Sequence, residues 1–290
     1  MFYEKRIKAL IIISLLLIES FVWIVNGPND FWTLGFFDQS GGQISVENPE
    51  SGGEEETPAD DGTSGQNADE PGLNPGETVD NDGYPAPDNR DRTVALEEAA
   101  EKGLLILVNK ENPIDKGYKP DDLTSIRYYV PDRSETTRYL RSEAAEAFHQ
   151  LVERAAMDGV ELKMTTAYRS YDFQKILYDS YVSREGEAAA NKYSAKPGQS
   201  EHQTGLAADV SSPSVDYQLS NDYGRTAEGK WLAENAHRFG FIIRFPEGKE
   251  EITGYQYEPW HIRYVGRAAA KEIYERNLTL EEFLLLNGIE

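Results

Sequence analysis

The sequence predicts an α+β domain, with a mainly antiparallel sheet flanked by helices, over about residues 94–290. Apolar residues recur at helical spacing in some segments and alternate in others. These two kinds of segment follow one another without a regular strand–helix–strand repeat, which would instead indicate a parallel sheet. Glycines stand where several of the segments end, as is typical of helix C-termini and turns.

Each element is predicted from its own pattern. The clearest is a helix over 142–158, where Phe148, Leu151 and Val152 recur at three- and four-residue spacings and Gly159 suits the C-terminal end. The other predicted helices span 171–184, 187–193 and 228–238, with further helical segments from 268 and from 279. The predicted strands are 104–108, 160–166, 205–210, 241–244 and 255–264.

The N-terminal segment has the order of an export signal. Basic residues at 5, 6 and 8 precede a mainly apolar run over 9–25, whose charged interruption is Glu19, followed by Ser20. No small-residue cleavage site follows, so we predict an uncleaved membrane anchor over 1–26, and a cleaved signal peptide stays the alternative. Because the basic flank stays inside, the predicted location is the cell membrane, single-pass, with the rest of the chain extracellular.

A tract over 27–93 separates this segment from the domain. It is rich in Gly, Pro, Asp, Glu, Ser and Asn, and it has too little apolar surface to offset chain entropy, so we predict a disordered acidic linker. The net charge of −22 disfavours nucleic acid as a partner. The chain has no cysteine, which excludes disulfides, thiolate zinc sites and cysteine nucleophiles. The oligomeric state stays open.

Two of the four histidines, His202 and His261, have neighbours that suit a metal site. An aspartate, Asp209, follows His202 by seven residues inside an apolar strand, where a carboxylate must be paired or bound to a metal. Two histidines and one carboxylate suit a catalytic zinc with an open fourth position. Glu258 precedes His261 by three residues and is the candidate general base. The alternative is that Asp209 pairs with an arginine and both histidines are structural.

The spacing of Glu258 and His261 requires an irregular strand. In a regular strand these two side chains point to opposite faces, and Pro259 disfavours a helix there. We therefore predict a bulge near Glu258 and Pro259 that directs both side chains to one metal. Arg169 follows a predicted strand and precedes a predicted helix, a usual place for a functional side chain, with a surface salt bridge as the alternative.

Two separated motifs carry a resemblance to a known family. They are His202-x-x-Gly205-x-Ala207-x-Asp209 and Glu258-Pro259-Trp260-His261. In this order they resemble the VanY-type D-alanyl-D-alanine carboxypeptidases, which belong with VanX dipeptidases, lysostaphin-type endopeptidases and the hedgehog domain. A third segment, Tyr168-Arg169-Ser170-Tyr171-x-x-Gln174, is similar to the arginine motif of the same family.

The resemblance implies a hedgehog/D-Ala-D-Ala-peptidase-like fold and a role for each motif residue. The zinc ligands are expected to be His202, Asp209 and His261. Glu258 is expected to move the proton of the attacking water, and Arg169 to stabilise the tetrahedral intermediate. Substrate contacts are implied for Ser200, Gln174, Tyr168 and Trp260.

The implied activity is that of a zinc D,D-carboxypeptidase, which removes the terminal D-alanine from peptidoglycan stem peptides. Its expected partners are these stem peptides and, through the N-terminal segment, the membrane. Two alternatives stay open: an L,D-carboxypeptidase acting on tetrapeptide stems, and a non-hydrolytic, zinc-containing module that binds the cell wall.

Overall fold

The computed structural model describes residues 23–26, 32–35, 80, 83–85, 90–131, 133–191 and 194–289. The chain divides into two units, Met1–Asn67 and Ala68–Glu290. In the first unit, β1 (Trp23–Asn26) pairs antiparallel with β2 (Trp32–Gly35). The second unit holds the predicted α+β domain, and the site described below lies within it.

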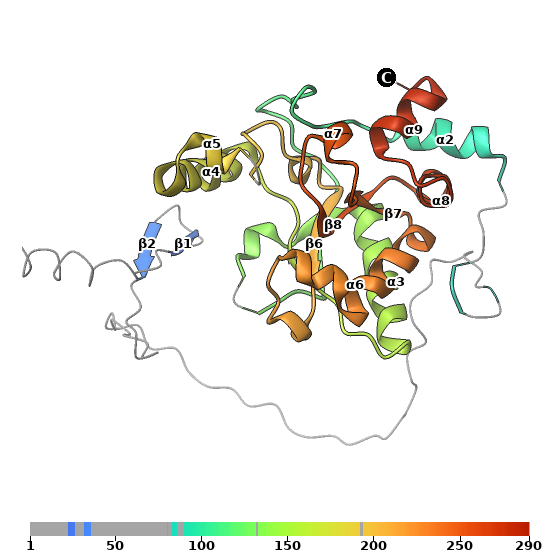
Figure 1. The fold of residues 1–290 in the computed structure, drawn as a ribbon, viewed down its shortest axis with the longest axis horizontal. Helices are drawn as coiled ribbons and strands as arrows, with labels where there is room; N and C mark the ends of the chain where they lie inside the picture. The colour runs from blue at the N-terminus through green and yellow to red at the C-terminus, as the bar shows by residue number, and fades with distance from the viewer. Residues whose placement is uncertain are drawn as a thin grey trace, which may run out of the picture. The chain divides into compact units, whose positions relative to one another are not determined.

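An antiparallel four-stranded sheet forms the centre of the second unit (Figure 1). Its strands, in spatial order, are β5 (Lys163–Thr166), β6 (Ala207–Ser211), β8 (Glu258–Tyr264) and β7 (Phe241–Phe245). Every residue of the central strand β6 is buried. A separate pair, β3 (Leu123–Ser125) and β4 (Tyr139–Arg141), is also antiparallel. The predicted antiparallel sheet is confirmed.

Helices surround this sheet, and α4 and α5 lie at one end of the domain while α2, α8 and α9 gather at the other (Figure 1). The α-helices are α2 (Arg92–Glu101), α3 (Ser142–Met157), α4 (Tyr171–Glu185), α5 (Glu187–Ala190), α6 (Ala227–Asn235), α7 (Glu250–Thr253), α8 (Arg267–Glu275) and α9 (Leu280–Asn287). Short 3-10 helices are η1 (Glu135–Thr137), η2 (Glu201–Thr204), η3 (Pro213–Val215), η4 (Asn221–Arg225) and η5 (Ala236–Phe239).

Helix α3 contributes the largest apolar face to the core, as its sequence pattern predicts. Phe148, Leu151 and Ala155 are completely buried on this face. The ring of Phe148 packs edge-on against Phe241 of β7, with 6.3 Å between the ring centroids. This packing joins the helix to an edge strand of the sheet.

The prediction of a strand over 104–108 is wrong. The chain instead turns after α2, where the Leu104 N–H donates to the Ala99 carbonyl. The carbonyls of Leu104 and Ile106 accept hydrogen bonds from Nη2 of the buried Arg263, at 3.0 and 2.8 Å. These carbonyls thus bond to a side chain 157 or more residues away and not to a neighbouring strand. A local apolar run in the sequence does not reveal such a partner.

The bulge predicted near Glu258 and Pro259 is confirmed. Ile243 of β7 lies opposite Ile262 of β8, and Phe245 lies opposite Glu258, so β8 takes four residue steps where β7 takes two. The extra residues bend the first part of β8. This irregularity changes the direction of the Glu258 side chain relative to a regular strand.

The predicted membrane anchor over 1–26 lies outside the described residues, apart from its last four, which form β1. Within the described part of the chain, no helix combines the length and the apolar character needed to cross a bilayer. The predicted linker over 27–93 is described only in part. One of its residues, Tyr84, contacts the domain: its hydroxyl donates to Asp158 at 2.8 Å, and its ring lies near the guanidinium groups of Arg154 and Arg238.

Gly229 in α6 provides a test of the local packing. Its N–H donates to the N-cap hydroxyl of Thr226, and a Cβ on this residue would lie 2.0 Å from the Tyr223 carbonyl oxygen. Replacing a glycine inside a helix with alanine normally raises the free energy of unfolding by up to about 1 kcal/mol. Because of this clash, we expect Gly229→Ala to lower the free energy of unfolding by about 1–3 kcal/mol in urea titrations.

The control for this prediction is Ala233→Gly, at an exposed position of the same helix. It should lose only the ordinary helix-propensity difference of about 1 kcal/mol. A Gly229→Ala protein as stable as the wild type would contradict the close approach of the Tyr223 carbonyl.

Candidate metal centre

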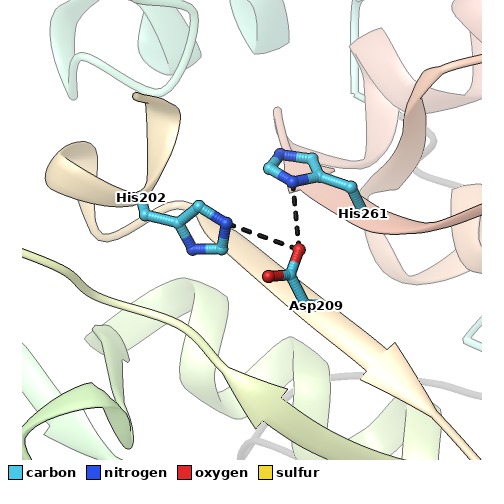
Figure 2. A group of neighbouring side chains, drawn as sticks. All are labelled: His202, Asp209 and His261. Carbon is cyan, nitrogen blue, oxygen red and sulfur yellow. Dashed lines mark hydrogen bonds and ion pairs between the residues drawn. The ribbon is translucent and has the colours of Figure 1, made fainter. Parts of the chain in front are cut away.

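Three segments bring the predicted ligands together (Figure 2). Asp209 on β6 lies directly opposite His261 on β8, and His202 lies on η2, just before β6. One donor atom from each residue falls within 4.8 Å of the other two, and all three side chains are buried. The sheet register and the short 3-10 helix therefore position the group.

The orientation of the two imidazoles leaves one nitrogen of each facing Asp209. His202 donates through Nδ1 to the Ala167 carbonyl at 2.6 Å, and its Nε2 lies 3.4 Å from Oδ1 of Asp209. For His261 it is Nδ1 that faces the same oxygen, at 3.1 Å. Two donors, each 2.0–2.1 Å from a tetrahedral zinc, would lie about 3.3 Å apart. These spacings fit such an ion.

The buried Nε2 of His202 supports the same interpretation, because it has no hydrogen-bond partner among the described residues. A buried polar atom without a hydrogen-bond partner lowers the stability of the fold unless a ligand or an ion binds it. Two imidazoles and a carboxylate are one of the donor sets that hold zinc in catalytic sites. The residues present therefore fit a zinc ion.

The charges of the ligands also suit a metal. Burial, reinforced by Arg169, lowers the pKa of His202 to about 4, so this imidazole is neutral at pH 7. Burial opposes the charged form of Asp209, but the two histidines outweigh it and lower the pKa of the carboxyl. For His261, burial is outweighed by the carboxylates of Asp209 and Glu201, which face its two ring nitrogens and raise its pKa to about 9. A metal binding at pH 7 must therefore displace a proton from His261.

Glu258 lies beside this group at the start of β8. Its Oε2 is 3.8 Å from Nδ1 of His261, so the bulge brings it to the same side as the ligand. Burial raises the pKa of Glu258 to about 7. A carboxyl that titrates near neutral pH is well matched to accepting and returning a proton.

Arg169 follows β5, and its backbone N–H donates to the His202 carbonyl at 3.2 Å. Its Nη1 lies 3.6 Å from Oδ2 of Asp209. The alternative interpretation of the sequence is that Asp209 pairs with an arginine, and Arg169 is such a neighbour. Both imidazoles nevertheless contact the other oxygen of the same carboxylate. The arginine is part of the site and not a surface salt bridge, because its side chain is only 15% exposed.

A cavity of about 330 Å³ opens onto the group. It is lined by seven of the nine predicted site residues: Arg169, Gln174, His202, Asp209, Glu258, Trp260 and His261. The other two predicted site residues, Ser200 and Tyr168, are buried and do not line this cavity. Gln174 donates through Nε2 to the Ala195 carbonyl at 2.8 Å, while its buried Oε1 has no partner in the described part of the chain.

Sequence reasoning missed three residues here. Tyr181 and Tyr257 line the cavity, and Glu201 lies behind His261, with Oε2 at 3.5 Å from Nε2 of that ring. Tyr181 follows Gln174 by seven residues in α4, so helical periodicity places both on one face. The signal for Glu201 in the sequence is a charged residue directly before a ligand, and the structure buries it with the rest of η2.

Comparison with known proteins gives consistent results. Residues 137–267 match the family described as VanY: D-alanyl-D-alanine carboxypeptidase. The putative carboxypeptidase YodJ of Bacillus subtilis is 47% identical over 184 residues, which cover 63% of this chain and 67% of the relative. The bifunctional D-Ala-D-Ala dipeptidase and carboxypeptidase VanXYC of Enterococcus gallinarum is 33% identical, over 62% of this chain and 92% of the relative.

Solved structures agree. The LdcB LD-carboxypeptidase is 46% identical, with a TM-score of 0.60 over 64% of this chain and 87% of that one. A vancomycin-resistance D,D-pentapeptidase VanY mutant with Zn(II) is 36% identical, with a TM-score of 0.53 over 62% of this chain and 98% of that one. The fold, the matched motifs and these relatives confirm the resemblance seen in the sequence, and the chain belongs to the VanY family of D-alanyl-D-alanine carboxypeptidases.

Proposed function

We propose that this protein is a zinc-dependent D,D-carboxypeptidase that removes the terminal D-alanine from peptidoglycan stem peptides. The observation that carries the proposal is the convergence of His202, Asp209 and His261 beside Glu258 at an open cavity. Two solved VanY structures support it, one with Zn(II) and one in complex with D-alanine-D-alanine.

In this proposal, His202, Asp209 and His261 hold the zinc ion. When bound, zinc supplies Lewis acidity, which makes a water molecule nucleophilic near pH 7 and polarises a carbonyl group. Glu258 accepts the proton of the attacking water and returns it to the leaving amine. The guanidinium of Arg169 donates to the carbonyl oxygen as negative charge develops there.

Two further lining residues position the substrate in this proposal. Because the amide NH₂ of Gln174 is bonded to Ala195, its free Oε1 is placed to accept a hydrogen bond from a substrate N–H group. Trp260 presents a partly buried ring to the cavity, suited to an apolar part of the stem. Ser200 and Tyr168 are buried outside the lining, so this proposal assigns them no direct contact with the substrate.

An L,D-carboxypeptidase is the second candidate. The specific observation in its favour is the similarity to the LdcB LD-carboxypeptidase, which is higher in both identity and TM-score than that to the VanY D,D-pentapeptidase. The motifs do not separate the two activities, so hydrolysis of pentapeptide and tetrapeptide stems has to decide between them.

Stem-peptide hydrolysis distinguishes these candidates. We expect the purified protein to release D-alanine from a synthetic pentapeptide stem, as measured by mass spectrometry, with complete loss in a chelator and recovery on adding zinc. Release from the tetrapeptide alone would establish the L,D-activity instead. Zinc binding without release from either peptide would indicate a non-hydrolytic wall-binding module.

Arg169 tests the oxyanion role. We expect Arg169→Met to lower kcat by about 10²- to 10³-fold, the usual effect of removing one oxyanion donor, while the zinc content stays at one per chain. The control is Arg127→Met, which removes an exposed arginine paired with Glu153 outside the cavity. An unchanged kcat in Arg169→Met would remove this residue from the mechanism.

We also propose a location, which rests on the sequence alone. The basic flank and apolar run over 1–26 support a single-pass anchor that holds the catalytic domain outside the cell, close to the wall. Protease added to intact cells should digest the domain. A domain protected until the cells are lysed would contradict this location.

A further inference from the structure

Glu201 precedes the ligand His202 in the chain, but its side chain contacts the other histidine ligand. Its Oε2 lies 3.5 Å from Nε2 of His261, on the side of the ring opposite to Asp209. Neither Oε2 nor Nε2 has a hydrogen-bond partner among the described residues, so each is the nearest polar group recorded for the other. The His261 ring is thus held between two carboxylates, one facing each nitrogen.

Two buried arginines hold Glu201 in place. Its Oε1 accepts from Nε of Arg244 at 2.7 Å and from Nη1 of Arg263 at 2.8 Å, and both arginines are completely buried. Arg263 also donates to two backbone carbonyls, and the far end of Arg244 is bound by Glu281. The Glu201 carboxylate therefore has little freedom to move.

The backbone explains why this network reaches the metal ligand. Arg263 follows His261 by two residues in β8, so both side chains project from the same face of the strand. The ring of His261 is further confined by Phe245, with 4.9 Å between the ring centroids. The two arginines, Arg244 and Arg263, are balanced in charge by Glu201 and Glu281. Charge neutrality of this buried network therefore does not require Glu201 to contact His261.

Stability alone does not account for such an arrangement. Buried ion pairs add little net stability compared with apolar residues of similar volume. A carboxylate behind a histidine ligand, in contrast, fixes the orientation of the ring and which nitrogen carries the hydrogen. At this position Glu201 would keep a hydrogen on Nε2 when a metal displaces the proton of Nδ1, which leaves the lone pair of Nδ1 for the ion.

We infer that Glu201 is a positioning residue of the metal centre: held by Arg244 and Arg263, it orients His261 so that Nδ1 faces the ion. The inference rests on the proposed metal site. Loss of such a partner typically lowers metal affinity about 10- to 100-fold.

The test compares Glu201→Gln with Glu281→Gln. Each variant removes one carboxylate from Arg244, but Glu281 has no contact with His261, so it is the matched control for a damaged ion-pair network. We expect both to unfold at lower temperature. Only Glu201→Gln should lose about 10- to 100-fold in zinc and cobalt affinity, measured by chelator competition.

The visible spectrum of the Co(II)-loaded protein is the second readout, since it reports ligand geometry. We expect it to change in Glu201→Gln and to match the wild type in Glu281→Gln. If Glu201→Gln does not fold, Glu201→Gln combined with Arg263→Gln removes one charge of each sign and carries the same expectation. Wild-type affinity and spectrum in the Glu201 variant would overturn the inference alone, whereas a wild type that binds no metal would overturn the metal site as well.

Discussion

Glu258→Gln is expected to keep its zinc and lose about 10²- to 10⁴-fold in kcat, the usual contribution of a general base. Glutamine has nearly the same shape, but it does not take up the proton of the attacking water. Glu258 is not one of the three grouped ligands, so the metal content should not change. The measurement is steady-state hydrolysis of stem peptide, together with elemental analysis of zinc.

The same variant has an expected signature in the metal-free protein. Burial raises the pKa of Glu258 from 4.5 to about 7, so between these values the folded state binds a proton that the unfolded state has released. This carboxyl therefore lowers stability as pH rises from about 4.5 through 7. Urea unfolding at pH 5 and pH 8 should show a smaller loss of stability in Glu258→Gln than in the wild type.

Two outcomes would count against these expectations. Full turnover in Glu258→Gln would exclude this residue as the base. An identical pH dependence of stability in variant and wild type would show that the folded protein does not raise the pKa of Glu258.

Asp209→Asn is expected to abolish zinc binding at micromolar zinc, and with it the hydrolysis of stem peptides. An amide is a much weaker zinc ligand than a carboxylate, and Asp209 lies between both histidines. Because the folded protein lowers the pKa of this carboxyl, the carboxylate also stabilises the metal-free fold at pH 7, a contribution that is lost as pH falls. The variant should therefore also be less stable at pH 7.

Asp158→Asn separates these two effects. Asp158 accepts hydrogen bonds from Tyr84, Arg154 and Trp231 and does not line the cavity. This control should lose stability yet keep zinc and activity. An Asp209→Asn protein that retains a full zinc complement would refute the ligand assignment.

The amino-acid pattern alone was sufficient for the parts of this protein that depend on neighbours in the chain. The apolar spacing of α3 and the alternation around β5 predicted elements that the structure contains. An aspartate in an apolar strand must be paired or bound to a metal, and the family resemblance carried by the two motifs implied which histidines join it. The bulge followed from the need to direct Glu258 and His261 to one side.

Tertiary contacts decided the rest. Residues 104–108 are not a strand because Arg263, far along the chain, donates hydrogen bonds to the carbonyls of Leu104 and Ile106. Tyr84 contacts the domain because its hydroxyl donates to Asp158 and its ring lies near two arginines. The contact of Glu201 with His261 likewise joins residues 60 positions apart. Periodicity reports whether a residue is buried, but it does not name the partner that a buried charge will find, because that partner is chosen by the packing of the whole domain.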